Sequence, residues 1–141
     1  MGTDSTISEN DVALFAADVF YDNPLGENGS AVTFYGAFYN FNFGPDYLLT
    51  GTSSTIGTGN ILYGQLGYLV PDFSEKIKVQ PYASYSHRLL EGQPDAASTL
   101  GIGVNGYLDG HNCKVTLEYR NDLNPAGVRT GSFRTQAMIY L

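Results

Sequence analysis

The chain has 141 residues, enough for one domain with one core, and we treat residues 1–141 as a single unit that begins with a polar segment at 1–10. A formal net charge of −7 argues against non-specific binding to nucleic acid, and no apolar run approaches the roughly 20 residues of a membrane-spanning helix. The single cysteine excludes a disulfide within the chain, and the first residues lack the basic start and apolar stretch of a signal peptide.

Tyrosine, phenylalanine and glycine are abundant, with 11, 8 and 17 copies, which favours pleated strands separated by turns. Alternating patterns predict strands, in chain order, at 12–21, 31–43, 60–70, 76–88, 98–108, 111–120 and 132–141. Each is about as long as the roughly 9–11 residues of a tilted membrane strand. The repeated strand and turn predict an all-β fold, an antiparallel up-and-down β-barrel or sheet with about 7–8 strands in this chain.

The Asp-Gly pair at 109–110 is a favoured two-residue hairpin turn, and it predicts a register for the strands on either side. The predicted pairs are Leu108 with His111, Gly106 with Cys113, Val104 with Val115, Ile102 with Leu117 and Leu100 with Tyr119. Every pair after the first is apolar or small. Turn chemistry and alternation therefore predict the same register.

Basic residues concentrate on one face of the predicted strands. Six of the seven lie on polar faces: Lys76, Lys78, Arg88, Lys114, Arg120 and Arg134. The seventh, Arg129, falls in a predicted loop, and most acids, including Asp22 and Asp122, fall in predicted connections. Aromatic residues occur on both faces of 31–43 and 60–70, so no facing is predicted for these two strands.

Alternation alone does not say which face is in water, because a soluble barrel turns its apolar face inward and a membrane barrel turns it toward lipid. The predicted connections alternate long and short, counted back from the C-terminus: 121–131, 109–110, 89–97, 71–75 and 44–59. This rhythm is typical of outer-membrane barrels. Two alternatives remain, a small soluble β-barrel that binds an apolar ligand and a non-conducting membrane barrel that serves as an anchor or adhesin.

Several stretches resemble the C-terminal part of the phosphate-selective porin O/P family: GNILYGQLGYLVP (59–71), KVQPYASYS (78–86), GVNGYLDGHNCKVTLEYRND (103–122) and, more loosely, ADVFYDNPLG (17–26). The resemblance runs from about residue 12 to the end, and the hairpin around DGHN is its most specific part. Two departures are Leu141, where an aromatic residue is usual, and Gly106, where a bulky residue is frequent. The family implies an anion-conducting, usually trimeric barrel of about 16 strands in a Gram-negative outer membrane.

The resemblance implies that the polar face lines a water-filled lumen and that the apolar face meets outer-membrane lipid. The basic residues named above then form the anion path. The polar lumen residues are Gln80, Ser84, Asn105, Thr116, Glu118 and Gln136. The lipid-facing residues are Val79, Ile102, Val104, Val115, Leu117 and Ile139. The closing SFRTQAMIYL resembles an assembly signal, carried by Phe133, Ile139 and Leu141.

The partners expected are lipid, small inorganic anions of the phosphate type and further copies of the chain. We expect no cofactor, metal site or catalytic residue, because His87 and His111 lack partners at ligand spacing. Cys113 is interpreted as a small lipid-facing residue, and Glu118 as an ion-pair partner of cations such as Arg134. An odd number of predicted strands leads us to expect part of a larger barrel, because bacterial single-chain barrels have an even number.

Overall fold

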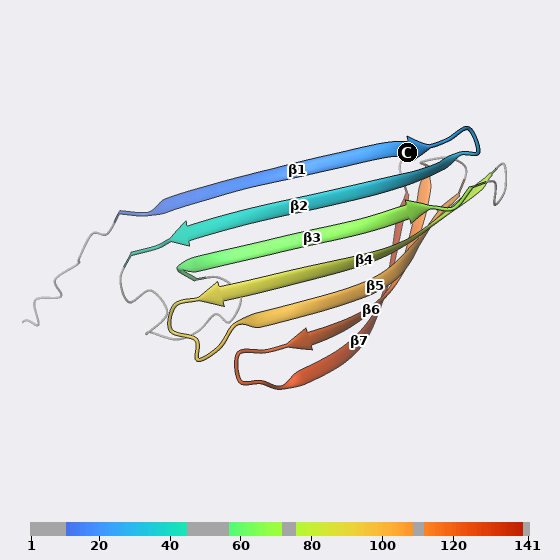
Figure 1. The fold of residues 1–141 in the computed structure, drawn as a ribbon. Coiled ribbons are helices and arrows are strands. Elements are labelled where there is room, and N and C mark those ends of the chain that lie inside the picture. The colour runs from blue at the N-terminus through green and yellow to red at the C-terminus, as the bar shows by residue number, and fades with distance from the viewer. Residues whose placement is uncertain (1–10, 45–56, 72–75, 109–111, 140–141) are drawn as a thin grey trace, which may run out of the picture.

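Seven antiparallel strands form one sheet in the computed structural model, which describes residues 11–44, 57–71, 76–108 and 112–139. The strands are β1 (Ala13–Leu25), β2 (Ser30–Asn42), β3 (Gly59–Leu69), β4 (Ile77–Leu90), β5 (Ala97–Leu108), β6 (Cys113–Leu123) and β7 (Arg129–Ile139). Each strand pairs with its sequence neighbours, in the order β1 to β7 (Figure 1). The all-β, up-and-down fold predicted from the sequence is confirmed.

Local chemistry explains where the strands stop, and the turn between β6 and β7 is the clearest case. The side-chain oxygen of Asn124 accepts hydrogen bonds from the backbone of Ala126 at 3.0 Å and of Val128 at 2.9 Å. Pro125 has no backbone N–H and cannot continue a ladder. Gly127 takes a φ of 77°, a conformation that costs glycine little. These residues reverse the chain and start β7 at Arg129.

Strand ends account for several corrections to the predicted pattern. Arg129 is the first residue of β7 rather than part of a loop, and Lys76 precedes β4 rather than lying within it. Asp22 belongs to β1 and Asp122 to β6, so neither lies in a connection. The connections run 26–29, 43–58, 70–76, 91–96, 109–112 and 124–128. Because the strands extend into the predicted loops, 124–128 and 91–96 are shorter than predicted, and the expected alternation of long and short connections fails where 70–76 exceeds 91–96.

The β5–β6 register differs from the predicted one by two residues. Leu108 pairs with Cys113, not with His111, and Val104 pairs with Leu117, not with Val115. A shift of two keeps every side chain on its predicted face, because strand side chains alternate with a period of two. The predicted pairing partners in this hairpin were therefore wrong, but the predicted face of each side chain was right.

The ladder registers assign every strand residue to one of two faces, which we call the polar face and the apolar face. The polar and tyrosine side chains of the polar face include Asp18, Asp22, Thr33, Tyr35, Tyr63, Gln65, Lys78, Gln80, Tyr82, Ser84, Arg88, Thr99, Asn105, Tyr107, Lys114, Thr116, Glu118, Arg120, Asp122, Arg134 and Gln136. On β1–β3 the same registers also place Leu14, Phe20, Phe41, Ile61 and Leu69 on this face. The apolar face carries Val19, Phe34, Phe38, Leu62, Leu66, Val79, Tyr85, Ile102, Val104, Val115, Leu117, Phe133 and Ile139.

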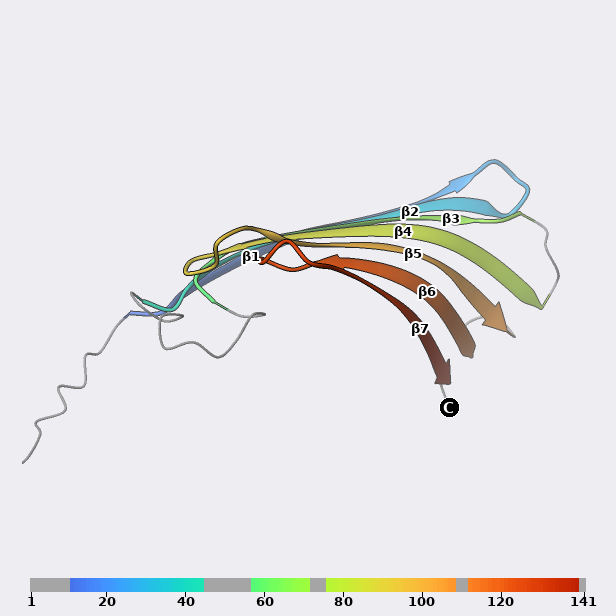
Figure 2. The ribbon, with the colours of Figure 1, turned by 90° about the horizontal axis from the view of Figure 1, so that it is seen from below.

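Burial is the reverse of that in an ordinary soluble sheet. On the polar face, Asn105 is 3% exposed and Gln80 is 8% exposed. On the apolar face, Ile102 is 59% exposed and Leu117 is 51% exposed. The sheet is curved, most strongly over β5–β7 (Figure 1, Figure 2). Side chains crowd on the inside of a curve, so the polar face is the concave one.

The sheet is open along β1 and β7. Within the described residues, each of these two strands has a ladder partner on one side only. Residues along β1 are almost all exposed, and no large side chain in the described part of the chain is fully buried. A domain normally buries its apolar faces between two layers, which this single curved sheet does not do. A curved, open up-and-down sheet is the geometry expected of part of a barrel wall.

Candidate functional site: the polar face

Gln80 is the centre of a hydrogen-bonded network that spans the polar face from β2 to β6. Its side-chain nitrogen donates to Oγ1 of Thr33 at 2.9 Å. Its side-chain oxygen accepts from Nδ2 of Asn105 at 3.1 Å and from the hydroxyl of Tyr107 at 2.9 Å. Thr116 donates to Oδ1 of Asn105 at 2.7 Å. This amide network gives the buried polar groups partners, without which their burial would be costly.

A second network on the same face is built around carboxylates. The hydroxyl of Tyr82 donates to Oε2 of Glu118 at 2.7 Å. Arg120 lies between two acids, with Nε 3.8 Å from Oε1 of Glu118 and Nη2 3.4 Å from Oδ1 of Asp122. Thr99 donates to the same oxygen of Asp122 at 2.6 Å. This carboxylate network fixes Arg120 in place and offsets its charge.

Glycines in β3 and β5 allow both networks to reach across a neighbouring strand. A Cβ on Gly67 would lie 2.7 Å from Oγ1 of Thr33 and 3.0 Å from Nε2 of Gln80. A Cβ on Gly103 would lie 2.6 Å from Cζ of Tyr82. Tyr82 therefore lies over Gly103, and its hydroxyl reaches β6. Only glycine, which has no side chain, leaves room at these positions for the side chains of Gln80 and Tyr82.

Gly103→Ala should destabilise the folded sheet, whereas Gly106→Ala should not. The new methyl group at 103 would displace the ring of Tyr82 and break its bond to Glu118, a bond to a charged group that is worth about 1.5–3 kcal/mol. At Gly106, a Cβ would meet only the carbonyl oxygen of Val115, at 3.9 Å. Denaturant unfolding of both variants measures the difference. Equal stabilities would show that the space over Gly103 is not needed.

The structure places five of the six predicted basic residues on the polar face and brings them onto β4, β6 and β7. These are Lys78, Arg88, Lys114, Arg120 and Arg134. Lys114 has its Nζ 5.7 Å from the centre of the Tyr107 ring, a cation–π arrangement. Nε of Arg88 is buried without a hydrogen-bond partner. The predicted ion pair of Glu118 with Arg134 is replaced by one with Arg120, although Arg134 is opposite Glu118 in the ladder.

Acids share the polar face with these bases, and only Glu118 among them was predicted from the sequence. Asp18 and Asp22 of β1 and Glu118 and Asp122 of β6 all have polar-face registers. No lysine or arginine precedes Lys76 in the sequence. The polar face is therefore acidic and aromatic on β1–β3 and predominantly basic on β4–β7.

Two hollows on this face each present one basic side chain. The first has a volume of about 450 Å³, and Lys78 faces it together with Asp22 and Tyr107. The second, of about 530 Å³, is lined by Arg134 together with Glu118. Each hollow thus offers a cation, an acid and hydrogen-bonding side chains to a small polar solute.

All the predicted lipid-facing residues lie on the apolar face, together with Phe133 of the predicted assembly signal. The other predicted lumen residues, including Ser84 and Gln136, lie on the polar face. His87 lies on the apolar face, 6.5 Å ring to ring from Tyr85, and Cys113 is at the start of β6. Leu141 and His111, which have predicted roles, lie outside the described residues.

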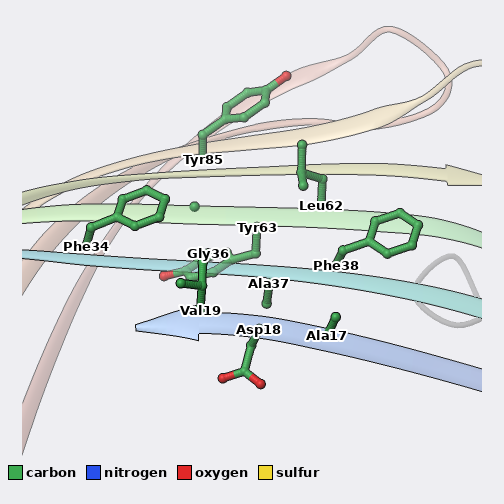
Figure 3. A pocket seen from close by; sticks show the side chains of 11 residues that line it. Ala17, Asp18, Val19, Phe34, Gly36, Ala37, Phe38, Leu62, Tyr63 and Tyr85 are labelled. Atoms are coloured by element: carbon green, nitrogen blue, oxygen red, sulfur yellow. The ribbon is translucent and has the colours of Figure 1, made fainter. Parts of the chain in front are cut away.

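The apolar face has a shallow hollow of about 480 Å³ (Figure 3). Its floor is the cross-strand pair Gly36 and Gly64, and Phe34, Phe38 and Leu62 are among the residues around it. Figure 3 shows Leu62 on one side of the sheet and Asp18 on the other, as the ladder registers require. The sequence had not predicted which side chains of β2 lie on which face, because this strand has aromatic residues on both faces.

In the described ranges, no group of histidine, cysteine and acidic side chains could hold a metal ion. Nor does this part of the chain contain a helix long and apolar enough to cross a bilayer. Comparison with family models, with curated proteins and with solved structures gave no match. The resemblance to the phosphate-selective porin O/P family therefore stays a prediction.

Proposed function

We propose that this sheet is part of the wall of an outer-membrane channel that prefers small anions. The observation that carries the proposal is the reversed burial, with polar side chains crowded on the concave side and apolar side chains exposed on the other. A membrane barrel has this arrangement, because lipid covers its outer surface and water fills its lumen. The polar face is then the lumen wall, and the apolar face meets outer-membrane lipid.

The energetics support a bilayer around the apolar face. Exposed contiguous apolar surface is rare in soluble monomers and marks a site covered by something else. A soluble barrel that binds an apolar ligand would need its apolar side chains on the concave side, where Gln80 and Asn105 are buried instead. Turning the sheet inside out in a bilayer would place Lys114 and Arg134 in lipid, at about 2–4 kcal/mol each near the midplane.

Anion preference rests on the basic part of the wall. Of the five bases on the polar face, Arg120 is the one with ion pairs, so it contributes least to the field in the lumen. Lys114 and Arg134 lie on neighbouring strands, and both contribute to the positive potential in the proposed lumen. Rings of basic side chains raise the local concentration of anions and repel cations. Because Asp18 and Asp22 share the wall, the preference should be modest.

The double variant Lys114→Glu/Arg134→Glu should shift the channel toward cations. Two positive charges on the wall become negative, so the local electrostatic potential becomes negative and attracts cations. The effect should be strongest at low salt, because the screening length is about 10 Å at 0.1 M. The measurement is the reversal potential across a planar bilayer under a salt gradient.

Arg129→Glu is the matched control for this experiment. Arg129 is exposed at the start of β7, with an apolar-face register, and its Nη1 donates to Oδ1 of Asn121 at 3.2 Å. Its reversal should leave the potential nearly unchanged. An unaltered potential in the double variant would place Lys114 and Arg134 off the conducting path. A membrane-inserted protein without conductance would support an anchor or adhesin instead.

Three finer features of the proposal rest on the resemblance and not on the geometry. They are the preference for phosphate-type anions, the assembly into trimers and the location in a Gram-negative outer membrane. Lys78 faces the first hollow of the polar face and Arg134 faces the second, so both hollows are compatible with a small inorganic anion. A bound anion would be held by charge and by neighbouring hydroxyl and amide groups.

A further inference from the structure

Four side chains surround Ala37 on the polar face, and we call this group the Ala37 cluster. In the ladders, Ala37 pairs with Asp18 of β1 on one side and with Tyr63 of β3 on the other. Tyr35 and Tyr39 flank it along β2, two residues away in each direction. Ala37 is only 4% exposed, because its larger neighbours cover it. Figure 3 shows Asp18, Ala37 and Tyr63 on the same side of the sheet.

The tyrosines of the cluster are positioned by one another and by the sheet. The ring centres of Tyr35 and Tyr63 are 6.0 Å apart, with a tilted arrangement. Tyr35 and Tyr39 have the same polar-face register on β2, on either side of Ala37. The hydroxyl of Tyr63 donates to Oε1 of Gln65 at 2.7 Å. The cluster therefore offers a solute three aromatic rings and one carboxylate, with the hydroxyl of Tyr63 already bonded to Gln65.

The charge of Asp18 is not balanced on its own part of the wall. No base occurs in the sequence before Lys76, so β1–β3 carry no lysine or arginine. Asp18 is exposed, and among the described residues the ion pairs of the polar face belong to β6. The face of an aromatic ring is negative, and it attracts a cation placed within about 6 Å of its centre.

We propose that the Ala37 cluster binds a small organic cation with an alkylated ammonium group. Three tyrosines beside one carboxylate match the chemistry that recognises quaternary ammonium, since the rings contact the methyl groups and the carboxylate attracts the charge. A metal ion would need more carboxylate or imidazole ligands than Asp18 alone. An anion would be repelled by Asp18 and by the ring faces. The site is distinct from the basic part of the wall on β4–β7.

The test is a titration of the folded, detergent-solubilised protein with choline and with its uncharged isostere 3,3-dimethyl-1-butanol, followed by calorimetry or by tyrosine NMR shifts. Choline should bind more tightly than the isostere. Asp18→Asn removes an exposed charge, so it should weaken choline binding by up to about five-fold and leave the isostere unaffected. The control Asp11→Asn removes the same charge from an exposed position before β1 and should change neither affinity.

A second pair of variants tests the rings. Tyr35→Leu should weaken choline binding, whereas Phe38→Leu, on the opposite face of the same strand, should not. Equal binding of choline and its isostere, or equal effects of the two aspartate variants, would overturn the proposal. Binding is measured without ion current, so it is independent of the proposed channel. A protein that binds choline and does not conduct contradicts only the channel, and one that conducts anions without binding choline contradicts only this site.

Discussion

Leu117→Arg should prevent normal assembly of the sheet in a lipid bilayer. Leu117 is in the middle of β6 on the apolar face, where half of its surface is exposed. If lipid covers this face, a guanidinium there costs about 2–4 kcal/mol near the midplane, a large share of the stability of a domain. Heat-modifiable migration after refolding into lipid vesicles measures the folded fraction, which should fall strongly.

The control for this variant is Gln136→Arg on the neighbouring strand. Gln136 is exposed on the polar face, opposite Thr116, so the added charge would remain in water. Its folded fraction should match that of the unaltered protein. Normal assembly of Leu117→Arg, or equal loss in both variants, would contradict a lipid-covered apolar face. The comparison tests the orientation of the sheet without depending on conductance.

Gln80→Leu should lower the free energy of unfolding by at least about 2 kcal/mol, since each buried polar group left without a partner costs about 1–3 kcal/mol. Leucine has nearly the same size but cannot bond to Thr33, Asn105 or Tyr107. Asn105 is itself buried, and it would keep only the bond from Thr116 among those described here. Equilibrium unfolding in urea, followed by tyrosine fluorescence, measures the change.

Gln136→Leu makes the same chemical change at an exposed position of the polar face. Its effect should stay within about 0.5 kcal/mol, as for most surface substitutions. Similar losses for both variants would mean that leucine on the polar face is harmful in general. A small effect at Gln80 alone would show that water replaces the network. The paired measurement separates these two explanations.

The sequence was informative where one face of a strand is polar throughout. In β4–β7, alternation predicted the strands apart from their ends, and the face of the described residues that it placed within them, because the period of a strand is two. It failed in β2 and β3, where Tyr35 and Phe34 are adjacent and lie on opposite faces. Alternation between polar and apolar residues cannot assign a strand that carries aromatic residues on both sides.

The partners of the side chains could not be predicted, because they depend on register and on reach across strands. The Asp-Gly turn predicted pairs that were two residues out, since the ladder ends at Leu108 and Cys113 and leaves 109–112 as the connection. The bond of Tyr82 to Glu118 crosses a whole strand and requires glycine at 103. One signal in the sequence was missed. It is a glycine at a polar-face position of a strand whose two neighbouring strands carry long polar side chains.

The glycines beneath these networks have a consequence for the bore of the proposed channel. A side chain that lies along a sheet occupies less height than one that stands upright on it. Gly67 and Gly103 allow Gln80 and Tyr82 to lie flat over their neighbouring strands. The lining is therefore thin and smooth, with its hydrogen-bonding groups tied to one another. For a given number of strands, such a wall leaves a wider cross-section for water and makes the channel's calibre insensitive to side-chain motion.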